Sequence, residues 1–277
     1  MKYATNSPAK ADFSDMVSLR LHILLVSLFM AVLPVFSTDS EGEGLSNSFM
    51  LEIGSAHRSD TYLTPLRYNG WNTALSYEHI HPLRAKPFVW TLNVGLELDR
   101  TMNPVRNAVM YGAQFDARWS FQRSWMVAKE IELGVGPATS LRAGALYLSR
   151  NGNNPVAANA SWTLDVAPFA VARFDVGKLP VVATYRAALP LVGAMFAPDY
   201  GQLYYEIYLG DSNGLFTGAY WGRYFRLDQR VTVDMKVGRK WLRVGYGADI
   251  LSTKVKGIVS RRIDHTFVLG ITTDWLW

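Results

Sequence analysis

Residues 266–277 read TFVLGITTDWLW, and the hydrophobic pattern of this stretch decides the fold class. A β-strand sends successive side chains to opposite faces, so the stretch would be apolar and aromatic on one face and small or polar on most of the other. Tryptophans at such a position are typical of the closing strand of an outer-membrane β-barrel, where aromatic rings lie at the membrane–water interface. The apolar face carries Phe267, Leu269, Ile271, Thr273, Trp275 and Trp277.

The same period-two alternation recurs in residues 88–99, 109–121 and 230–237, which predicts a fold built of β-strands. We therefore expect an all-β chain: a single transmembrane antiparallel up-and-down β-barrel of about 12 strands, with 10 to 14 compatible with the pattern. The fifth expected strand is overlong and contains Pro137, which predicts a bulge or a split. The expected strands are residues 48–59, 71–80, 88–99, 108–121, 126–147, 161–176, 179–189, 202–210, 215–226, 229–238, 240–255 and 262–277.

The connectors between these strands support the barrel independently. Outer-membrane barrels have short periplasmic turns and long outer loops, and the expected connectors alternate in this way. A connector at 227–228 breaks the rule. A soluble β-sandwich is the alternative fold, but it has no reason to segregate its loops by length. The short connectors are 81–87, 122–125, 177–178, 211–214 and 239, and the longer ones are 60–70, 100–107, 148–160, 190–201 and 256–261.

The amino-terminal region resembles a secretory leader. An apolar run from Ile23 to Val35 follows Arg20 and ends near Ser37, where small residues suit a cleavage site. The run is too short to span a bilayer as a helix. We expect residues 1–37 to be leader and signal peptide, with Met16 as an alternative start. Residues 38–47 would then be a short periplasmic segment, residues 48–277 the transmembrane barrel, and the outer membrane the destination.

Composition excludes several classes of function. The chain has no cysteine, so zinc–thiolate sites, thiol nucleophiles and lipidated cysteines are ruled out. Its formal charge of +5 comes from scattered residues rather than a basic patch, so we expect no nucleic-acid partner. The mean hydropathy of +0.03 suits strands with alternating faces. The expected partner of such a surface is outer-membrane lipid, and we expect no cofactor and no metal.

Charged residues of both signs fall on the parity that would face the interior. They allow two interpretations: a charge-lined path for small solutes, or a network of internal ion pairs that fills a narrow barrel with its own side chains. We favour the network. The predicted interior residues are Glu97, Asp116, Arg118, Asp165, Arg173, Arg186, Glu206, Asp234 and Lys236.

Three segments carry a family resemblance: Asn47–His57 (NSFMLEIGSAH), Ser149–Pro155 (SRNGNNP) and Pro198–Gly210 (PDYGQLYYEIYLG). They resemble an uncharacterised family of outer-membrane β-barrel proteins from Bacteroides-type bacteria, over the length of the mature chain. The resemblance implies location and architecture only. In size and expected strand number the chain is also similar to outer-membrane phospholipase A, and fold alone does not define function.

Likeness to that phospholipase suggests an alternative function, lipid acyl hydrolysis, with calcium assisting. His57 and Ser59 share the outward parity of the first expected strand, near the outer rim, where a histidine can act as base to a serine nucleophile. The third residue of such a triad would be Asn72 or Asn69. Asn72 has inward parity, Asn69 lies in the expected loop, and a polar rim pair is the simpler interpretation.

Two further groups of residues have expected roles. Arg150, Asn151, Asn153 and Asn154 lie in an outer loop rich in turn-forming residues, which favours a tight turn and allows partner binding. Phe267, Trp275 and Trp277 are expected to form the signal that the barrel-assembly machinery reads. The leading functional prediction is thus a narrow or plugged outer-membrane barrel that passes small solutes or binds an extracellular or periplasmic partner, without enzymatic residues.

Overall fold

The structure is a computed structural model, which describes residues 46–83, 87–152, 154–201, 214–238 and 240–273. The elements in these ranges are all strands, and none of the described segments is a helix long and apolar enough to cross a membrane. The strands are β1 (Ser46–Asp60), β2 (Arg67–Pro82), β3 (Phe88–Met102), β4 (Val109–Ala128), β5 (Ile131–Leu148), β6 (Val156–Val176), β7 (Leu179–Phe196), β8 (Phe216–Tyr220), β9 (Tyr224–Val237), β10 (Lys240–Val255) and β11 (Ile258–Thr273).

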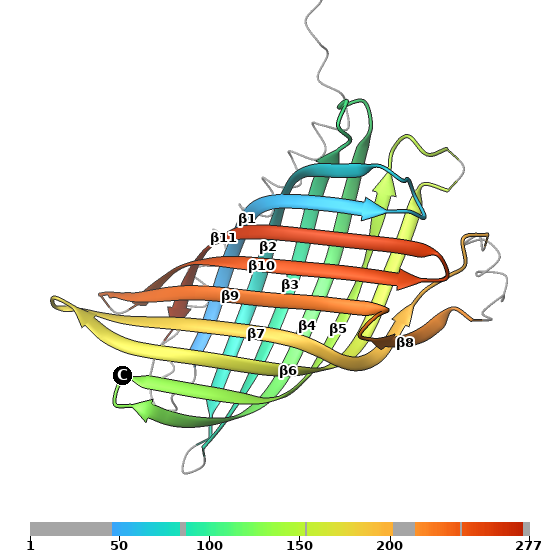
Figure 1. The fold of residues 1–277 in the computed structure, drawn as a ribbon. Helices are drawn as coiled ribbons and strands as arrows, with labels where there is room; N and C mark the ends of the chain where they lie inside the picture. Colours follow the sequence, from blue (N-terminus) through green and yellow to red (C-terminus); the bar gives the residue numbers. More distant parts are fainter. Residues whose placement is uncertain (1–45, 84–86, 153, 202–213, 239, 274–277) are drawn as a thin grey trace, which may run out of the picture.

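The described strands close into an antiparallel barrel. Each strand from β1 to β7 pairs with the next, β7 pairs with β9, and β9 to β11 continue the ring until β11 pairs with β1. Figure 1 shows β11, β10, β9 and β7 as the near wall, crossing β3, β4 and β5 of the far wall at a steep angle. The predicted single up-and-down barrel is confirmed, with ten strands in the ring and β8 as an additional strand.

The ring has fewer strands than the twelve expected, and the main reason lies in the strands beside β7. β9 pairs with residues 181–188 of β7, and β8 pairs with residues 192–196, so both follow the same side of one strand. A turn at 221–223 separates them, in which the Trp221 indole donates a hydrogen bond to the carbonyl of Pro190 (2.6 Å). The expected connector at 227–228 is wrong, because β9 passes through it unbroken. The expected strand 202–210 lies outside the described residues.

Two other strand boundaries also differ from expectation. β4 continues to Ala128, so the expected connector at 122–125 is wrong and the chain turns at 129–130 instead. β5 runs past Pro137 in constant register with β6, so the strand is neither bulged nor split there. The connector expected at 256–261 is a two-residue turn of Lys256 and Gly257, both with positive φ (51° and 78°), the geometry that tight hairpins require.

The connectors divide between two ends of the barrel. What we name the turn end has the connectors 83–87, 129–130, 177–178 and 238–239, together with the first and last described residues of the ring. The loop end has 61–66, 103–108, 149–155, 197–215 and 256–257. All but the last of the loop-end connectors exceed the turn-end ones in length, which agrees with the predicted alternation.

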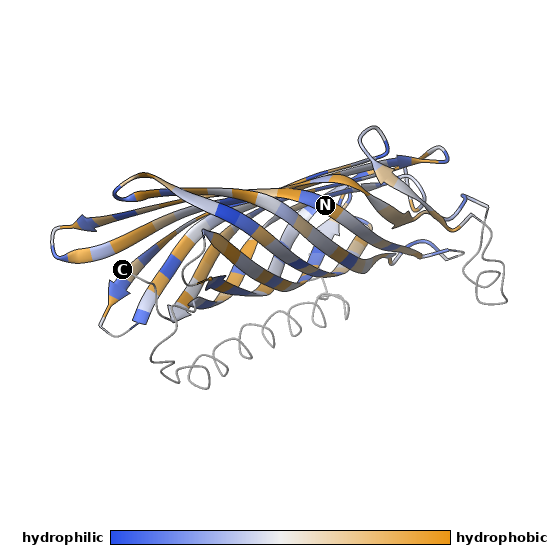
Figure 2. Ribbon diagram, turned by 90° about the horizontal axis from the view of Figure 1, so that it is seen from below, coloured by the Kyte–Doolittle hydropathy of each residue, from blue (hydrophilic) through white to orange (hydrophobic). Residues whose placement is uncertain are grey.

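Polarity is inverted relative to a soluble protein. Large apolar side chains are exposed on the outside, as with Trp119 (52% exposed) and Leu96 (45%), whereas Arg58 and Arg243 inside are almost fully buried. Figure 2 shows the resulting alternation of hydrophilic and hydrophobic residues along the strands. An apolar outer surface over a polar interior is the arrangement of a transmembrane β-barrel, because lipid takes the place of water outside. The soluble sandwich is therefore excluded.

Candidate functional site

The interior of the barrel is layered, and the layers define the candidate site. At the turn end, apolar side chains from five strands meet across the interior and pack together. We name this group the turn-end cluster. Arg186 belongs to the next layer toward the middle of the barrel. Its guanidinium lies over the ring of Phe169, a member of this cluster, at 5.2 Å from the ring centroid. The turn-end cluster consists of Ile80, Val89, Phe169, Val171, Val182 and Trp241.

The middle of the barrel holds three groups of ion pairs. The first joins β1, β3 and β11. Arg58 contacts Asp99 (2.9 Å), Asp264 (2.7 Å) and Glu97 (3.0 Å), so every nitrogen of its guanidinium has an acceptor. Arg262 completes the group through Asp264 (2.6 Å) and Glu97. Buried charges remain stable only when paired in this way, so the group fixes the relative position of three strands.

The second group spans the barrel between β4, β5, β9 and β10. Arg142 and Arg226 both contact Asp116 and Asp249: Arg142 at 3.2 and 2.9 Å, and Arg226 at 2.7 and 2.9 Å. Two arginines and two aspartates thus form a charge-balanced quartet. These side chains lie across the interior from one another, so the quartet occupies the space that an open pore would need.

Arg118 extends the second group toward neighbouring strands. It contacts Asp228 on β9 (2.7 Å) and the Ser140 hydroxyl on β5 (2.9 Å), and that hydroxyl donates to Asp165 on β6 (2.5 Å). The contact between Arg118 and Asp228 joins residues 110 positions apart in the sequence. This chain of contacts ties the quartet to the wall on the β6 side.

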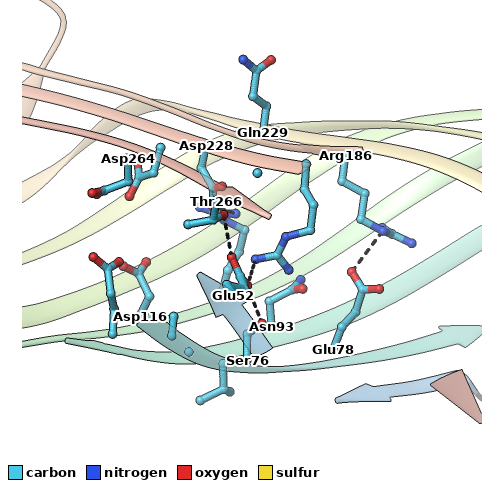
Figure 3. Close-up of a pocket in the computed structure, with 18 of the residues that line it drawn as sticks. Glu52, Ser76, Glu78, Asn93, Asp116, Arg186, Asp228, Gln229, Asp264 and Thr266 are labelled. Atoms are coloured by element: carbon cyan, nitrogen blue, oxygen red, sulfur yellow. Dashed lines mark hydrogen bonds and ion pairs between the residues drawn. The ribbon is translucent and has the colours of Figure 1, made fainter. Parts of the chain in front are cut away.

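The third group lies nearer the turn end. Arg243 contacts Asp234 (2.8 Å) and Glu78 (2.7 Å), and Glu78 also forms an ion pair with Arg186 (3.3 Å). Arg230 contacts Glu52 (2.5 Å), which in turn accepts a hydrogen bond from the Ser76 hydroxyl (2.6 Å). Figure 3 shows Arg186 and Glu78 of this group pointing toward one another from facing strands.

Two cavities lie on either side of the quartet. The inner cavity, about 140 Å³, is lined mainly by acids and their partners, among them Glu52, Glu78, Asp116 and Asp228. The second, about 110 Å³, lies at the loop end, and we name it the outer pocket. Gln114 lines both, whereas Arg58, Arg142 and Arg262 line only the outer one. The quartet and its neighbours therefore divide the interior.

The predicted interior residues lie largely where parity places them. Glu97, Asp116, Arg118, Asp165, Arg186 and Asp234 belong to the three groups. Arg173 contacts Glu132 (2.9 Å) near the turn end. Lys236 is exposed at that end, with its Nζ 5.9 Å from the ring centroid of Trp241, and is not part of the network. Glu206 lies outside the described residues.

Several network residues escaped the sequence analysis. Arg226 and Asp228 were missed because a connector was expected at 227–228. The inward position of Arg58 could have been predicted from the sequence, because it lies on the parity opposite to the outward Ile53 and His57 of the same strand. The others share the inward parity of their strands, but only the fold shows which of them are paired: Glu52, Glu78, Asp99, Arg142, Arg230, Arg243, Asp249, Arg262 and Asp264.

The predicted hydrolytic residues are only partly brought together. His57 and Ser59 lie on the outward parity of β1, and His57 Nδ1 lies 2.8 Å from Asn69 Oδ1 on β2. Asn72 is wrong as the orienting residue, because it is fully buried on the inner face and donates to Glu97 (3.2 Å). Among the described residues, no cluster of three or more His, Asp or Glu side chains has the geometry to hold a metal ion.

The predicted loop residues pack against neighbouring loops. Arg150 donates to the carbonyl of Asn107 (3.2 Å), and Asn151 donates to the carbonyl of Asn154 (2.9 Å), which is turn chemistry within the loop. The Asn154 amide contacts the Tyr62 hydroxyl (2.5 Å) of another loop. Asn153 lies outside the described residues. Phe267 faces outward on β11 (55% exposed), and Trp275 and Trp277 lie outside the described residues.

Fold and interior together define a transmembrane β-barrel whose middle is occupied by its own ion pairs. The chain belongs to the family described as protein of unknown function (DUF3316), whose model matches residues 20–276. None of the curated proteins matches the chain. A family without assigned function agrees with the resemblance found in the sequence, whereas a Bacteroides-type source and a likeness to phospholipase A stay predictions.

Solved structures of similar fold share little sequence. The outer membrane protease OmpT from Escherichia coli is 8% identical, with a TM-score of 0.46 over 86% of this chain and 99% of that one. The translocator domain of the autotransporter NalP from Neisseria meningitidis is 8% identical, with a TM-score of 0.37 over 95% and 98%. A FadL homologue from Pseudomonas aeruginosa is 9% identical, with a TM-score of 0.32 over 84% and 91%. Likeness at this level carries no information on activity.

Proposed function

We propose that the protein is an outer-membrane barrel with a closed interior, which binds a small ligand from the loop end and is not an open channel. The observation that carries this proposal is the layering: an apolar cluster at the turn end, charged groups in the middle and a pocket at the loop end. An apolar constriction excludes water and ions, and paired charges across a narrow barrel leave no continuous path. The layering favours partner or ligand binding over free solute passage.

Conductance tests the closed interior. We expect the purified wild-type protein in planar lipid bilayers to show no unitary conductance steps. A matched variant should open the barrel without changing its net charge. It replaces Arg142, Arg226, Asp116 and Asp249 by alanine, which removes two charges of each sign. It also carries Phe169→Ala and Trp241→Ala, which thin the turn-end cluster.

The variant is expected to conduct where the wild type does not. Steady ion conductance by the wild-type protein would contradict the proposal. Location is tested separately: the protein should stay with the outer-membrane fraction after carbonate extraction and migrate differently in gels before and after boiling, as a folded barrel does. Loss from the membrane fraction would contradict the proposed location.

A second candidate function, lipid acyl hydrolysis, rests on the contact between His57 and Asn69. A histidine oriented by an amide on the outward face, beside Ser59, is the arrangement that a lipid-facing serine hydrolase needs. Release of fatty acid from phospholipid vesicles, with and without added calcium, tests it. Ser59→Ala should abolish the activity, and Ser55→Ala, two outward positions away on β1, should preserve it. Absence of release by the wild type rejects this candidate.

A further inference from the structure

The outer pocket has apolar walls and a floor of arginine side chains. One wall belongs to a cluster that includes Tyr62, Leu146 and Ala157, and the facing wall to a cluster of Met195 and Tyr224 against which Leu251 packs. The floor is formed by Arg58, Arg142 and Arg262 of the middle layer. Most of the acids that neutralise them line the inner cavity instead, and Asp60 is the one acid among the residues that line the outer pocket.

Arg142 differs from the other floor residues in its hydrogen bonding. Its Nη1 contacts Asp249 (2.9 Å) and Asp116 (3.2 Å), but its Nε and Nη2 are buried and have no hydrogen-bond partner among the described residues. The side chain is about 3% exposed. A buried donor without an acceptor is costly, and native structures rarely leave two on one side chain. These two nitrogens are adjacent in the guanidinium, which is the edge that binds both oxygens of a carboxylate.

We propose that the outer pocket binds a small monocarboxylate with an apolar body, its two oxygens accepting from Nε and Nη2 of Arg142 and its hydrocarbon part lying between the two apolar clusters. The pocket volume is about 110 Å³. A cavity of about 150 Å³ holds one benzene molecule, so the body that fits inside is roughly six carbons or fewer. This ligand class rests on the proposed function, since it identifies what the closed barrel takes up at its loop end.

The charge of the floor favours a monoanion over a dianion. Asp116 and Asp249 already neutralise Arg142 and Arg226, so every added negative charge is costly in this buried layer, and a dianion such as phosphate costs more than a monocarboxylate that satisfies both free donors of Arg142. A neutral alcohol would satisfy only part of the Arg142 edge. An amine would meet arginine donors, and the carboxylate of Asp60, which also lines the pocket, already accepts a hydrogen bond from the Tyr62 backbone amide (2.9 Å). The arrangement therefore discriminates by head group as well as by size.

Calorimetric titration of the detergent-purified protein tests the proposal with three probes of equal chain length: hexanoate, hexanol and hexylamine. Hexanoate should bind saturably, hexanol at least about tenfold more weakly because it loses a charge-assisted hydrogen bond, and hexylamine not measurably. Arg142→Lys keeps the charge and the contacts to aspartate but removes the paired donors, so hexanoate affinity should fall at least about tenfold. Arg173→Lys, the same change near the turn end and outside both the outer pocket and the three ion-pair groups, should leave affinity within about twofold of wild type.

A second variant leaves the ion pairs unchanged, so its effect on binding cannot be attributed to misfolding of the network. Thr253 lines the pocket from β10, and Thr253→Phe should fill it, so binding of hexanoate and hexanol should disappear while heat-modifiable migration is kept. Equal affinity for hexanoate and hexanol, no effect of Arg142→Lys, or no hexanoate binding by a folded wild type would each overturn the ligand assignment. Bilayer recordings keep the two proposals separate. A barrel that shows no conductance and does not bind hexanoate rejects the ligand assignment only. A barrel that conducts and binds hexanoate rejects the closed interior only.

Discussion

The buried charged side chains inside this barrel are stabilised mainly by ion pairs, and Arg58 is the clearest case. It is almost fully buried, and three carboxylates from two other strands surround it. Parity in the sequence predicted which side chains point inward. It could not predict their partners, because a contact such as that of Arg118 with Asp228 depends on the curvature and register of the whole ring. Pairing is a property of the closed fold.

Removing Arg58 is expected to be strongly destabilising. Arg58→Ala would leave Asp99, Asp264 and Glu97 with excess negative charge in a buried layer, which costs about 3–5 kcal/mol of unfolding free energy. Arg67→Ala, at an exposed position at the loop end of β2, should change stability by less than about 0.5 kcal/mol. Urea unfolding in lipid vesicles, followed by tryptophan fluorescence, measures both. Similar stabilities for the two variants would contradict the structural importance of the network.

Strand elements were predicted well where their alternation was uninterrupted, and badly where a connector was inferred from composition. The tight turn at 129–130 is a Lys-Glu pair, which contains neither the glycine nor the proline that usually marks a turn. Stretches that contain polar residues within strands, such as 122–125 (Gln-Arg-Ser-Trp) and 227–228 (Leu-Asp), were mistaken for connectors. In a barrel with a charged interior, polar residues interrupt the apolar pattern without ending the strand.

At the junction of β1 and β11, where the ring closes, a glycine determines how closely the strands approach. A Cβ at Gly54 would lie 1.8 Å from the carbonyl oxygen of His265 on the backbone of β11. Gly54→Ala is therefore expected to weaken the β1–β11 pairing and lower the unfolding free energy by about 1–3 kcal/mol.

Gly95→Ala is the matched control, because the nearest atoms to a Cβ there are at 3.8 Å. It should leave stability within about 0.5 kcal/mol of wild type. Samples of each variant are heated to a series of temperatures and run on gels. The temperature at which the folded, faster or slower migrating band gives way to the unfolded band is then compared between the two variants. Equal transition temperatures would argue against close backbone packing at the junction.

The molecule as a whole is organised for a lipid environment. Its exposed outer surface carries aromatic and aliphatic side chains, and rings gather toward the turn end, where His79 and His81 pack against Trp90 at 4.8 and 5.4 Å. Amphipathic rings of this kind are typical of the membrane interface. The same side chains in water would make the barrel aggregate, so the fold and its solvent cannot be considered separately.

An outward charge midway along a strand should oppose folding in lipid. Leu96 lies near the middle of β3, exposed on the outer face, and Leu96→Arg is expected to cost about 2–4 kcal/mol of folding free energy in vesicles. Leu96→Ala controls for lost apolar area. The two variants are compared by urea unfolding in vesicles. If arginine were tolerated as well as alanine, the outward face of β3 would not be in contact with the hydrocarbon core.

The ion pairs of Arg58 also have a consequence for assembly. Asp264 lies 206 positions away in the sequence, on the strand that closes the ring, so Arg58 meets it only when the first and last strands have joined. A slip of one residue would turn these charges outward toward lipid, and a slip of two would separate them inside. The group therefore selects the register between β1 and β11. Closure in the wrong register is disfavoured because it leaves these charges unpaired, and closure in the correct register pairs every one of them.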